Sequence, residues 1–172
     1  MKAFVLAIVA AVSFTAAAQK NSQDWFAQLQ GDEYYWAATF NDSGGILGQW
    51  CYFESQGCMY LVATNTACES DAKYPILANS DAGAVVLEIV CRGSFDSNGT
   101  KKYRYVFTDF DSIDGIVRKA IRVGFAMPLK DGYFNVVRFT LASSNGEIDR
   151  MRAAASQRMS AAAKKSTRDT RL

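Results

Sequence analysis

Apolar residues in the segment 112–123 recur at the spacing of one face of an α-helix. They fall at i, i+3, i+4, i+7 and i+8, as Ile113, Ile116, Val117, Ala120 and Ile121. Such a stripe needs a surface to cover. Asp111 or Ser112 can accept hydrogen bonds from the first turn, and Gly124 can adopt the left-handed conformation that ends a helix. The pattern therefore predicts a helix near 112–123 that packs on a sheet.

Most of the other apolar residues follow the spacing of β-strands. Strands are predicted at 34–40, 46–53, 58–64, 84–92, 102–108, 125–129 and 133–142, separated by segments rich in Gly, Asn and Asp. The turn at residues 96–99 has the Asn-Gly pair that is typical of a tight β-hairpin. Residues 21–30 differ, because Trp25, Phe26 and Leu29 fit one helical face, so a short helix is predicted there.

The C-terminal region predicts a second helix and a tail. Ile148, Met151, Ala155 and Met159 recur at three- and four-residue steps, which predicts a helix near 145–162 that starts at Ser144 or Asn145. Residues 164–172 contain almost no apolar side chain and are predicted as a flexible basic tail. The tally favours an α+β class, in which a mainly antiparallel β-sheet, either a sandwich or an open barrel, carries both helices.

The N-terminal residues have the order of a secretory signal peptide. Lys2 precedes the apolar residues 3–14, and alanines at 16–18 fit the rule for signal peptidase. A buried N-terminal helix is the alternative. We expect residues 1–18 to be cleaved and residues 19–163 to form a single domain. No later segment is apolar enough to cross a membrane, so no transmembrane segment is expected in the mature chain.

Charge gives little support for a nucleic-acid partner. The chain has 19 basic and 17 acidic side chains, which leaves almost no net field. Basic residues do gather after position 146, where they could bind nucleic acid, lipid head groups or an acidic partner. Alanines rather than aromatic residues separate them, so a solvated helix face is the preferred interpretation and no nucleic-acid partner is predicted.

Cysteine usage predicts two disulfides. Cys51, Cys58, Cys68 and Cys91 make an even number in a chain that the leader directs to an oxidising compartment. Three pairings are possible, and the preferred one joins Cys51 to Cys58 across a hairpin, which leaves Cys68 for Cys91. A zinc site is the alternative, but the chain has no histidine and no Cys-x-x-Cys pair. No metal and no cofactor are predicted.

The absence of histidine also limits catalysis. Ser-His and Cys-His nucleophile arrangements are excluded, so the chain is predicted not to be an enzyme. A Ser-Lys pair or a pair of carboxylates remains possible as catalytic machinery, and the densest acidic group is Asp109, Asp111 and Asp114. Their spacing departs from the calcium-loop pattern. The preferred interpretation is that they cap and charge a helix N-terminus.

Aromatic residues gather in the first third of the mature chain. A ligand groove could use them, although packing of β-hairpins explains most of them more simply. Tyrosines suit a groove better than tryptophans because their hydroxyls often stay exposed. The possible binding surface is therefore assigned to Tyr34, Tyr35, Tyr52 and Tyr60.

Several short segments, taken in order, resemble the bacterial invasion-associated locus B family. They are the leader, Tyr35-Trp36-Ala37-Ala38, Trp50-Cys51-Tyr52, Phe107-Thr108-Asp109, the helix at 116–124 and Arg138-Phe139-Thr140-Leu141 before a helix with Ile148. The resemblance implies an envelope or secreted bacterial protein, in some members connected with host-cell invasion. It transfers no site residue.

These observations predict a non-enzymatic, periplasmic or secreted bacterial protein that binds an envelope component or a host molecule. The alternative is a proteinaceous inhibitor of an extracytoplasmic enzyme such as lysozyme, which would present a loop as a plug.

Overall fold

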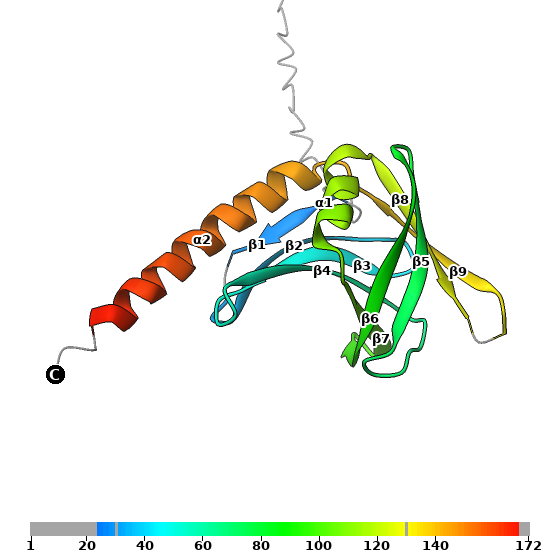
Figure 1. The fold of residues 1–172 in the computed structure, drawn as a ribbon, viewed down its shortest axis with the longest axis horizontal. Coiled ribbons are helices and arrows are strands. Elements are labelled where there is room, and N and C mark those ends of the chain that lie inside the picture. Colours follow the sequence, from blue (N-terminus) through cyan, green and yellow to red (C-terminus); the bar gives the residue numbers. More distant parts are fainter. Residues whose placement is uncertain (1–23, 30, 130, 169–172) are drawn as a thin grey trace, which may run out of the picture.

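The computed structural model describes residues 24–29, 31–129 and 131–168. The signal peptide predicted at 1–18 lies outside these residues. The described part forms nine strands and two helices (Figure 1). They are β1 (Phe26–Gln28), β2 (Tyr34–Phe40), β3 (Ile46–Tyr52), β4 (Gly57–Thr64), β5 (Lys73–Ser80), β6 (Gly83–Ser97), β7 (Thr100–Phe107), α1 (Phe110–Lys119), β8 (Arg122–Pro128), β9 (Phe134–Thr140) and α2 (Ser144–Arg168).

All nine strands belong to one antiparallel sheet, in the order β1-β2-β3-β4-β7-β6-β5-β8-β9. The sheet curls so that its ends approach each other. The indole Nε1 of Trp25, just before β1, donates to the Thr140 carbonyl of β9 at 2.9 Å. The predicted α+β class is confirmed, and of the two predicted sheet arrangements the structure has the open, barrel-like one.

The predicted hairpins have the expected local chemistry. Cys51 and Cys58 lie directly opposite each other in the β3–β4 hairpin. The β6–β7 hairpin turns at Asn98 and Gly99, whose φ angles of 53° and 74° lie in the left-handed region. Asn and Gly tolerate that region best, which explains the turn at this point of the chain.

The first predicted helix exists, but its ends were wrong. The cap is Asp109, whose side chain accepts from the Ser112 amide, rather than Asp111 or Ser112. The helix ends at Lys119, and Gly124 lies inside β8. Ile121 is consequently 62% exposed instead of completing the apolar stripe. The helical spacing had continued by chance into a strand, which pairing with β5 and β9 determines.

The helix predicted at residues 21–30 was also wrong. Within the described part of that segment, Phe26–Gln28 is a strand that pairs with β2. Trp25 packs into the main core, and Phe26 belongs to a separate apolar cluster on the other face of the sheet. Alternation between two apolar faces had imitated one helical stripe.

The C-terminal helix is longer than the predicted 145–162. Its inner face is as predicted, with Ile148, Met151 and Ala155 fully buried. The backbone remains helical to Arg168, through most of the segment predicted as a tail, and Figure 1 shows the C-terminal turns extending past the sheet. Alanine, lysine and arginine are strong helix formers, so polarity alone did not end this helix. Residues 169–172 lie outside the described part.

The main core lies inside the curled sheet, where both helices cover it. A smaller apolar cluster lies on the outer face of the first half of the sheet, around Ala38, Ile46, Leu61 and Ala63. Neither helix in the described part is long and apolar enough to cross a membrane.

Candidate functional site

The tyrosines assigned to a possible binding surface lie on two faces of the sheet. Tyr34 and Tyr52 are direct cross-strand partners on the outer face, with ring centroids 5.2 Å apart. Tyr35 points to the inner face, where its ring meets that of Phe53 at 4.8 Å. Tyr60 is 1% exposed. The structure therefore brings two of the four together and separates the others from them.

The three acidic residues near α1 have different roles. Asp109 caps the helix, accepting from the Ser112 amide at 3.0 Å and from the Ser112 hydroxyl at 2.6 Å, and these bonds lower the pKa of the carboxyl. Asp111 lies in the first turn of the helix. Asp114 turns inward to the sheet. The capping interpretation is confirmed for Asp109, while the role of Asp114 was missed.

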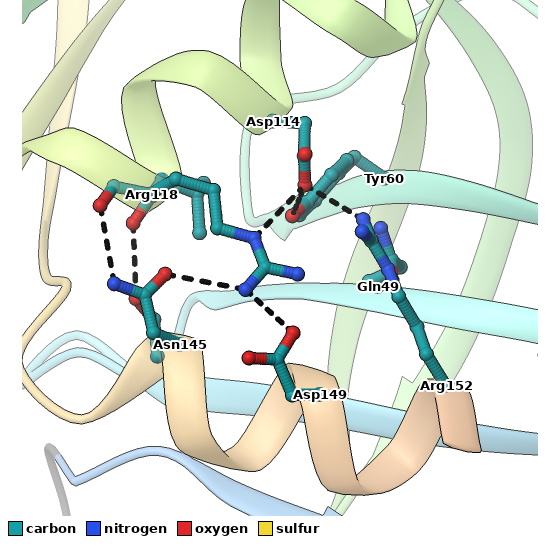
Figure 2. Close-up of polar contacts among 9 residues, drawn as sticks. Gln49, Tyr60, Asp114, Arg118, Asn145, Asp149 and Arg152 are labelled. Atoms are coloured by element: carbon teal, nitrogen blue, oxygen red, sulfur yellow. Dashed lines mark hydrogen bonds and ion pairs between the residues drawn. The ribbon is translucent and has the colours of Figure 1, made fainter. Parts of the chain in front are cut away.

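Asp114 is the centre of a polar network between the sheet and the two helices (Figure 2). It accepts from the Tyr60 hydroxyl at 2.6 Å and from Nη2 of Arg152 at 2.6 Å. Nε of Arg118, one helical turn further along α1, lies 3.6 Å from the same carboxylate oxygen. One carboxylate thus links β4, α1 and α2.

Burial and pairing fix the protonation states at this centre. Burial raises the pKa of the Tyr60 phenol well above its usual range, and its hydrogen bond to Asp114 raises it further. For Asp114, burial acts to raise the pKa, but the Tyr60 hydrogen bond and the charges of Arg152 and Arg118 together lower it. Near neutral pH the tyrosine stays protonated and the aspartate stays charged. Neither group suits proton transfer at that pH.

A second set of contacts joins the two helices directly. The Ser144 hydroxyl donates to the Val117 carbonyl at 2.9 Å, and the Asn145 side-chain amide donates to the Arg118 carbonyl at 3.1 Å. α2 starts at Ser144, as predicted, and the side chains of Ser144 and Asn145 also satisfy carbonyls at the end of α1. The Arg118 guanidinium then pairs with Asp149 at 2.7 Å. These hydrogen bonds and this ion pair hold the two helices together.

Gln49 completes the network on the sheet side. Its Oε1 accepts from Nε of Arg152 at 2.7 Å, while its Nε2 is buried and has no hydrogen-bond partner among the described residues. The side chain is fully buried within the main core. An unpaired buried amide lowers the stability of the fold. The hydrogen bond between Gln49 and Arg152 partly offsets this cost.

A separate cleft of about 780 Å³ opens on the outer face of the sheet, between the β2–β3 turn and strands β5, β8 and β9. Its lining comes from Phe40, Asn41, Asp42, Ser43, Asn79, Ser80, Asp81, Arg122, Val123, Gly124, Val136, Val137, Arg138, Phe139 and Thr140. Its volume is within the usual range for ligand sites. Asp109 and Asp114 do not line it.

The floor of the cleft is a cross-strand row with a glycine at its middle. Gly124 on β8 lies opposite Asn79 on β5 and opposite Arg138 on β9. Arg122 lies on the same face, two residues before Gly124. The side chains of Asn79, Arg122 and Arg138 are exposed and make no hydrogen bond or ion pair with the part of the chain that the structure describes.

Asp81 lies in the same cleft but is already engaged. Its carboxylate accepts from the backbone amides of Ile121 at 2.9 Å and Arg122 at 3.0 Å. The Arg122 amide in particular lowers the pKa of this carboxyl. Asp81 therefore fixes the start of β8 through its hydrogen bonds to these two backbone amides.

Both predicted disulfides are present, Cys51–Cys58 and Cys68–Cys91, and no cysteine is free. The preferred pairing is confirmed. Within the described residues, no group of three or more Cys, Asp or Glu side chains is arranged to hold a metal ion.

Sequence reasoning missed the cleft. The signal in the sequence was that Arg122 and Gly124 occupy alternate positions of β8, and Arg138 a position in β9, among residues that are mostly apolar. Because Arg122 had been placed in the last turn of a helix, the alternation was not recognised. Comparison of the chain with protein-family models, with curated proteins and with solved structures found no match.

Proposed function

We propose that this is a non-enzymatic protein that works outside the cytoplasm by binding another molecule, and that the cleft on β5, β8 and β9 is its binding site. The observation that carries the proposal is a pair of exposed arginines, Arg122 and Arg138, which line a ligand-sized cleft and form no hydrogen bond or ion pair through their side chains within the described residues. Two exposed positive charges on one face raise the local positive potential, which attracts an anionic ligand.

The chemistry of the polar groups favours binding over catalysis. Tyr60, Asp114 and Arg152 are engaged with one another, and the chain has no histidine that could act as a general base. Asp114, whose pKa is lowered, is not poised to exchange protons near neutral pH. Binding is therefore the simpler role.

Location outside the cytoplasm is supported by the two disulfides and by the leader-like residues 1–18. Structural disulfides persist in oxidising compartments and are uncommon in a reducing cytosol. The resemblance to the invasion-associated locus B family points the same way, and it remains a prediction. An envelope component or a host molecule would be the corresponding ligand.

The test is site-specific photocrosslinking in cells that export the protein. A photoreactive amino acid at Val136, which lines the cleft, should trap a defined partner. The same amino acid at Glu54, in the exposed β3–β4 turn, is the matched control and should not trap it. A trapped species that depends on Val136 and disappears in Gly124→Leu supports the cleft. Equal trapping from both positions, or none from either, would refute it.

A second candidate function is inhibition of an extracytoplasmic enzyme such as lysozyme. The observation that favours it is the β8–β9 hairpin, which Figure 1 shows projecting from the body. Tyr133 and Phe134, at the start of its returning strand, are 72% and 63% exposed. Exposed aromatic side chains on a hairpin suit insertion into an active-site groove.

Inhibition assays separate this candidate from the first. A lysozyme inhibitor should reduce cell-wall lysis at micromolar concentration and lose that effect in Tyr133→Ala/Phe134→Ala. Unchanged lysis by lysozymes of several types, together with crosslinking from Val136, would leave the cleft-binding proposal alone.

A further inference from the structure

We infer that the cleft receives a carboxylate of a partner protein, bound by Arg122 and Arg138, with apolar side chains next to that carboxylate seated on the adjacent row of the sheet. The inference rests on the proposed function, because it names the chemistry of the ligand for the same cleft.

The anion site follows from the register of three strands. Gly124 has no side chain, and its cross-strand partners Asn79 and Arg138 stand on either side of it. An added Cβ at Gly124 would lie 3.5 Å from Cγ of Arg138 and 3.9 Å from the Asn79 carbonyl. These are ordinary van der Waals distances, so Gly124 is not open space, but it adds no side chain of its own between Arg138 and Asn79. Arg122 lies on the same strand face as Gly124, two residues and about 7 Å before it in β8.

Arginine favours oxyanions for geometric reasons. Its planar guanidinium matches the two oxygens of a carboxylate or a phosphate with parallel hydrogen bonds. Asp81 accepts from the backbone amides of Ile121 and Arg122, and the charge of Arg122 also helps to lower its pKa, but no ion pair joins the two side chains within the described residues. Asp42 lines the opposite side of the cleft, on the β2–β3 turn. The guanidiniums of Arg122 and Arg138 are thus left available to a ligand.

An apolar row beside the anion site points to a protein as the ligand. Val86, Leu77, Ala126 and Val136 are successive cross-strand partners on β6, β5, β8 and β9, next to the row of Asn79, Gly124 and Arg138. Val86, Leu77 and Val136 are 68%, 45% and 42% exposed. Contiguous exposed apolar side chains next to arginine are typical of protein interfaces. A free anion or a simple acidic sugar would leave this row uncovered.

The charge and the apolar row together define the ligand. The two rows lie about 7 Å apart, the distance between alternate residues of an extended chain. A segment that carries Asp or Glu close to Leu, Val or Phe would place its carboxylate on the arginines and its apolar side chains on the row. Because both arginines are exposed, salt should weaken this binding.

The probe is a library of random heptapeptides displayed on phage, panned against the full-length oxidised protein. We expect enrichment of sequences in which Asp or Glu lies two positions from an apolar residue. The double variant Arg122→Gln/Arg138→Gln should not enrich them. Selected peptides, synthesised with a fluorophore, should bind that variant about ten-fold more weakly or worse, as expected for losing charge-assisted hydrogen bonds. Arg158→Gln removes the same charge from α2 and should change the dissociation constant less than about two-fold.

Further outcomes of these binding measurements distinguish a failure of this inference from a failure of the proposed function. Selected peptides without acids that bind the double variant normally, but not Gly124→Leu, would overturn the carboxylate assignment and keep the cleft. Peptides that bind Gly124→Leu normally would overturn the cleft itself. Binding of inorganic phosphate or glucuronate, abolished in the double variant while no peptide is enriched, would overturn the protein partner in favour of a small acid. Thermal melts of every variant confirm that each is folded.

Discussion

The hydroxyl of Tyr60 lies 2.6 Å from the carboxylate of Asp114, at the point where the sheet and both helices meet. The carboxylate also binds Arg152 of α2, so one oxygen connects residues that are far apart in the sequence. An ion pair that is partly exposed contributes little by itself. Here the hydrogen bond from the buried Tyr60 and the half-buried position of Asp114 make the carboxylate more important than a surface pair.

Asp114→Asn should lower the free energy of unfolding by roughly 1–3 kcal/mol, because two arginines and a buried hydroxyl lose a charged acceptor. The pKa of Asp114 is lowered in the folded state, so its charge stabilises the fold above the unfolded pKa, about 4, and this contribution is lost as the pH falls below that value. Urea titrations between pH 7 and pH 3 should give a smaller acid-dependent decrease for Asp114→Asn than for the wild type.

Tyr60→Phe is the control for this prediction, since it removes one hydrogen bond and keeps the carboxylate. It should give an intermediate acid dependence. Identical pH profiles for the wild type and Asp114→Asn would contradict the assignment of Asp114 as a stabilising charge.

Val117→Asp should unfold the domain or destabilise it by at least about 3 kcal/mol, because it buries an unpaired charge beneath α1. Val117 is fully buried. Ile121→Asp is the matched variant: the helical spacing of the sequence places Ile121 on the same stripe, but its side chain is 62% exposed after the end of the helix. Its circular dichroism melt should stay close to that of the wild type. Equal destabilisation by both variants would mean that α1 continues to residue 121.

Two glycines should respond in opposite ways to alanine. At Gly48 a Cβ would lie 2.5 Å from both the Ala37 carbonyl and the Ala38 Cβ, so Gly48→Ala should destabilise by roughly 1–3 kcal/mol. Gly115 lies inside α1 with open space around it, so Gly115→Ala should stabilise by about 0.5–1 kcal/mol. Chemical denaturation would measure both. A loss of stability in Gly115→Ala would show that open space at this position is not sufficient.

Removing each disulfide should cost stability, and the loss should grow with the logarithm of the length of the loop that it closes. The sequence separations are 7 for Cys51–Cys58 and 23 for Cys68–Cys91. Loop-closure entropy then predicts losses of about 2.5 and about 3.5 kcal/mol for the paired alanine variants. Equilibrium denaturation under oxidising conditions would compare them.

Alkylation of the wild-type protein without reductant, followed by mass spectrometry, should detect no free thiol, and a modified cysteine would contradict the pairing.

The sequence by itself determined those features that depend on neighbours in the chain. Alternation predicted the strand at residues 34–40, the Asn98-Gly99 pair predicted a hairpin, and cysteine spacing across another hairpin predicted Cys51–Cys58. Each depends on local backbone preference or on short loops, which a single sequence records directly.

Only the tertiary structure decided the features that depend on distant partners. Pairing of β8 with β5 and β9 ended α1 early and exposed Ile121. The curl of the sheet brought the turn after β2 to the same cleft as Gly124, and packing of α2 brought Arg152 to Asp114. These contacts join residues separated by tens of positions, and no local pattern specifies them. These long-range contacts form cooperatively, because each becomes favourable only when the whole sheet has closed.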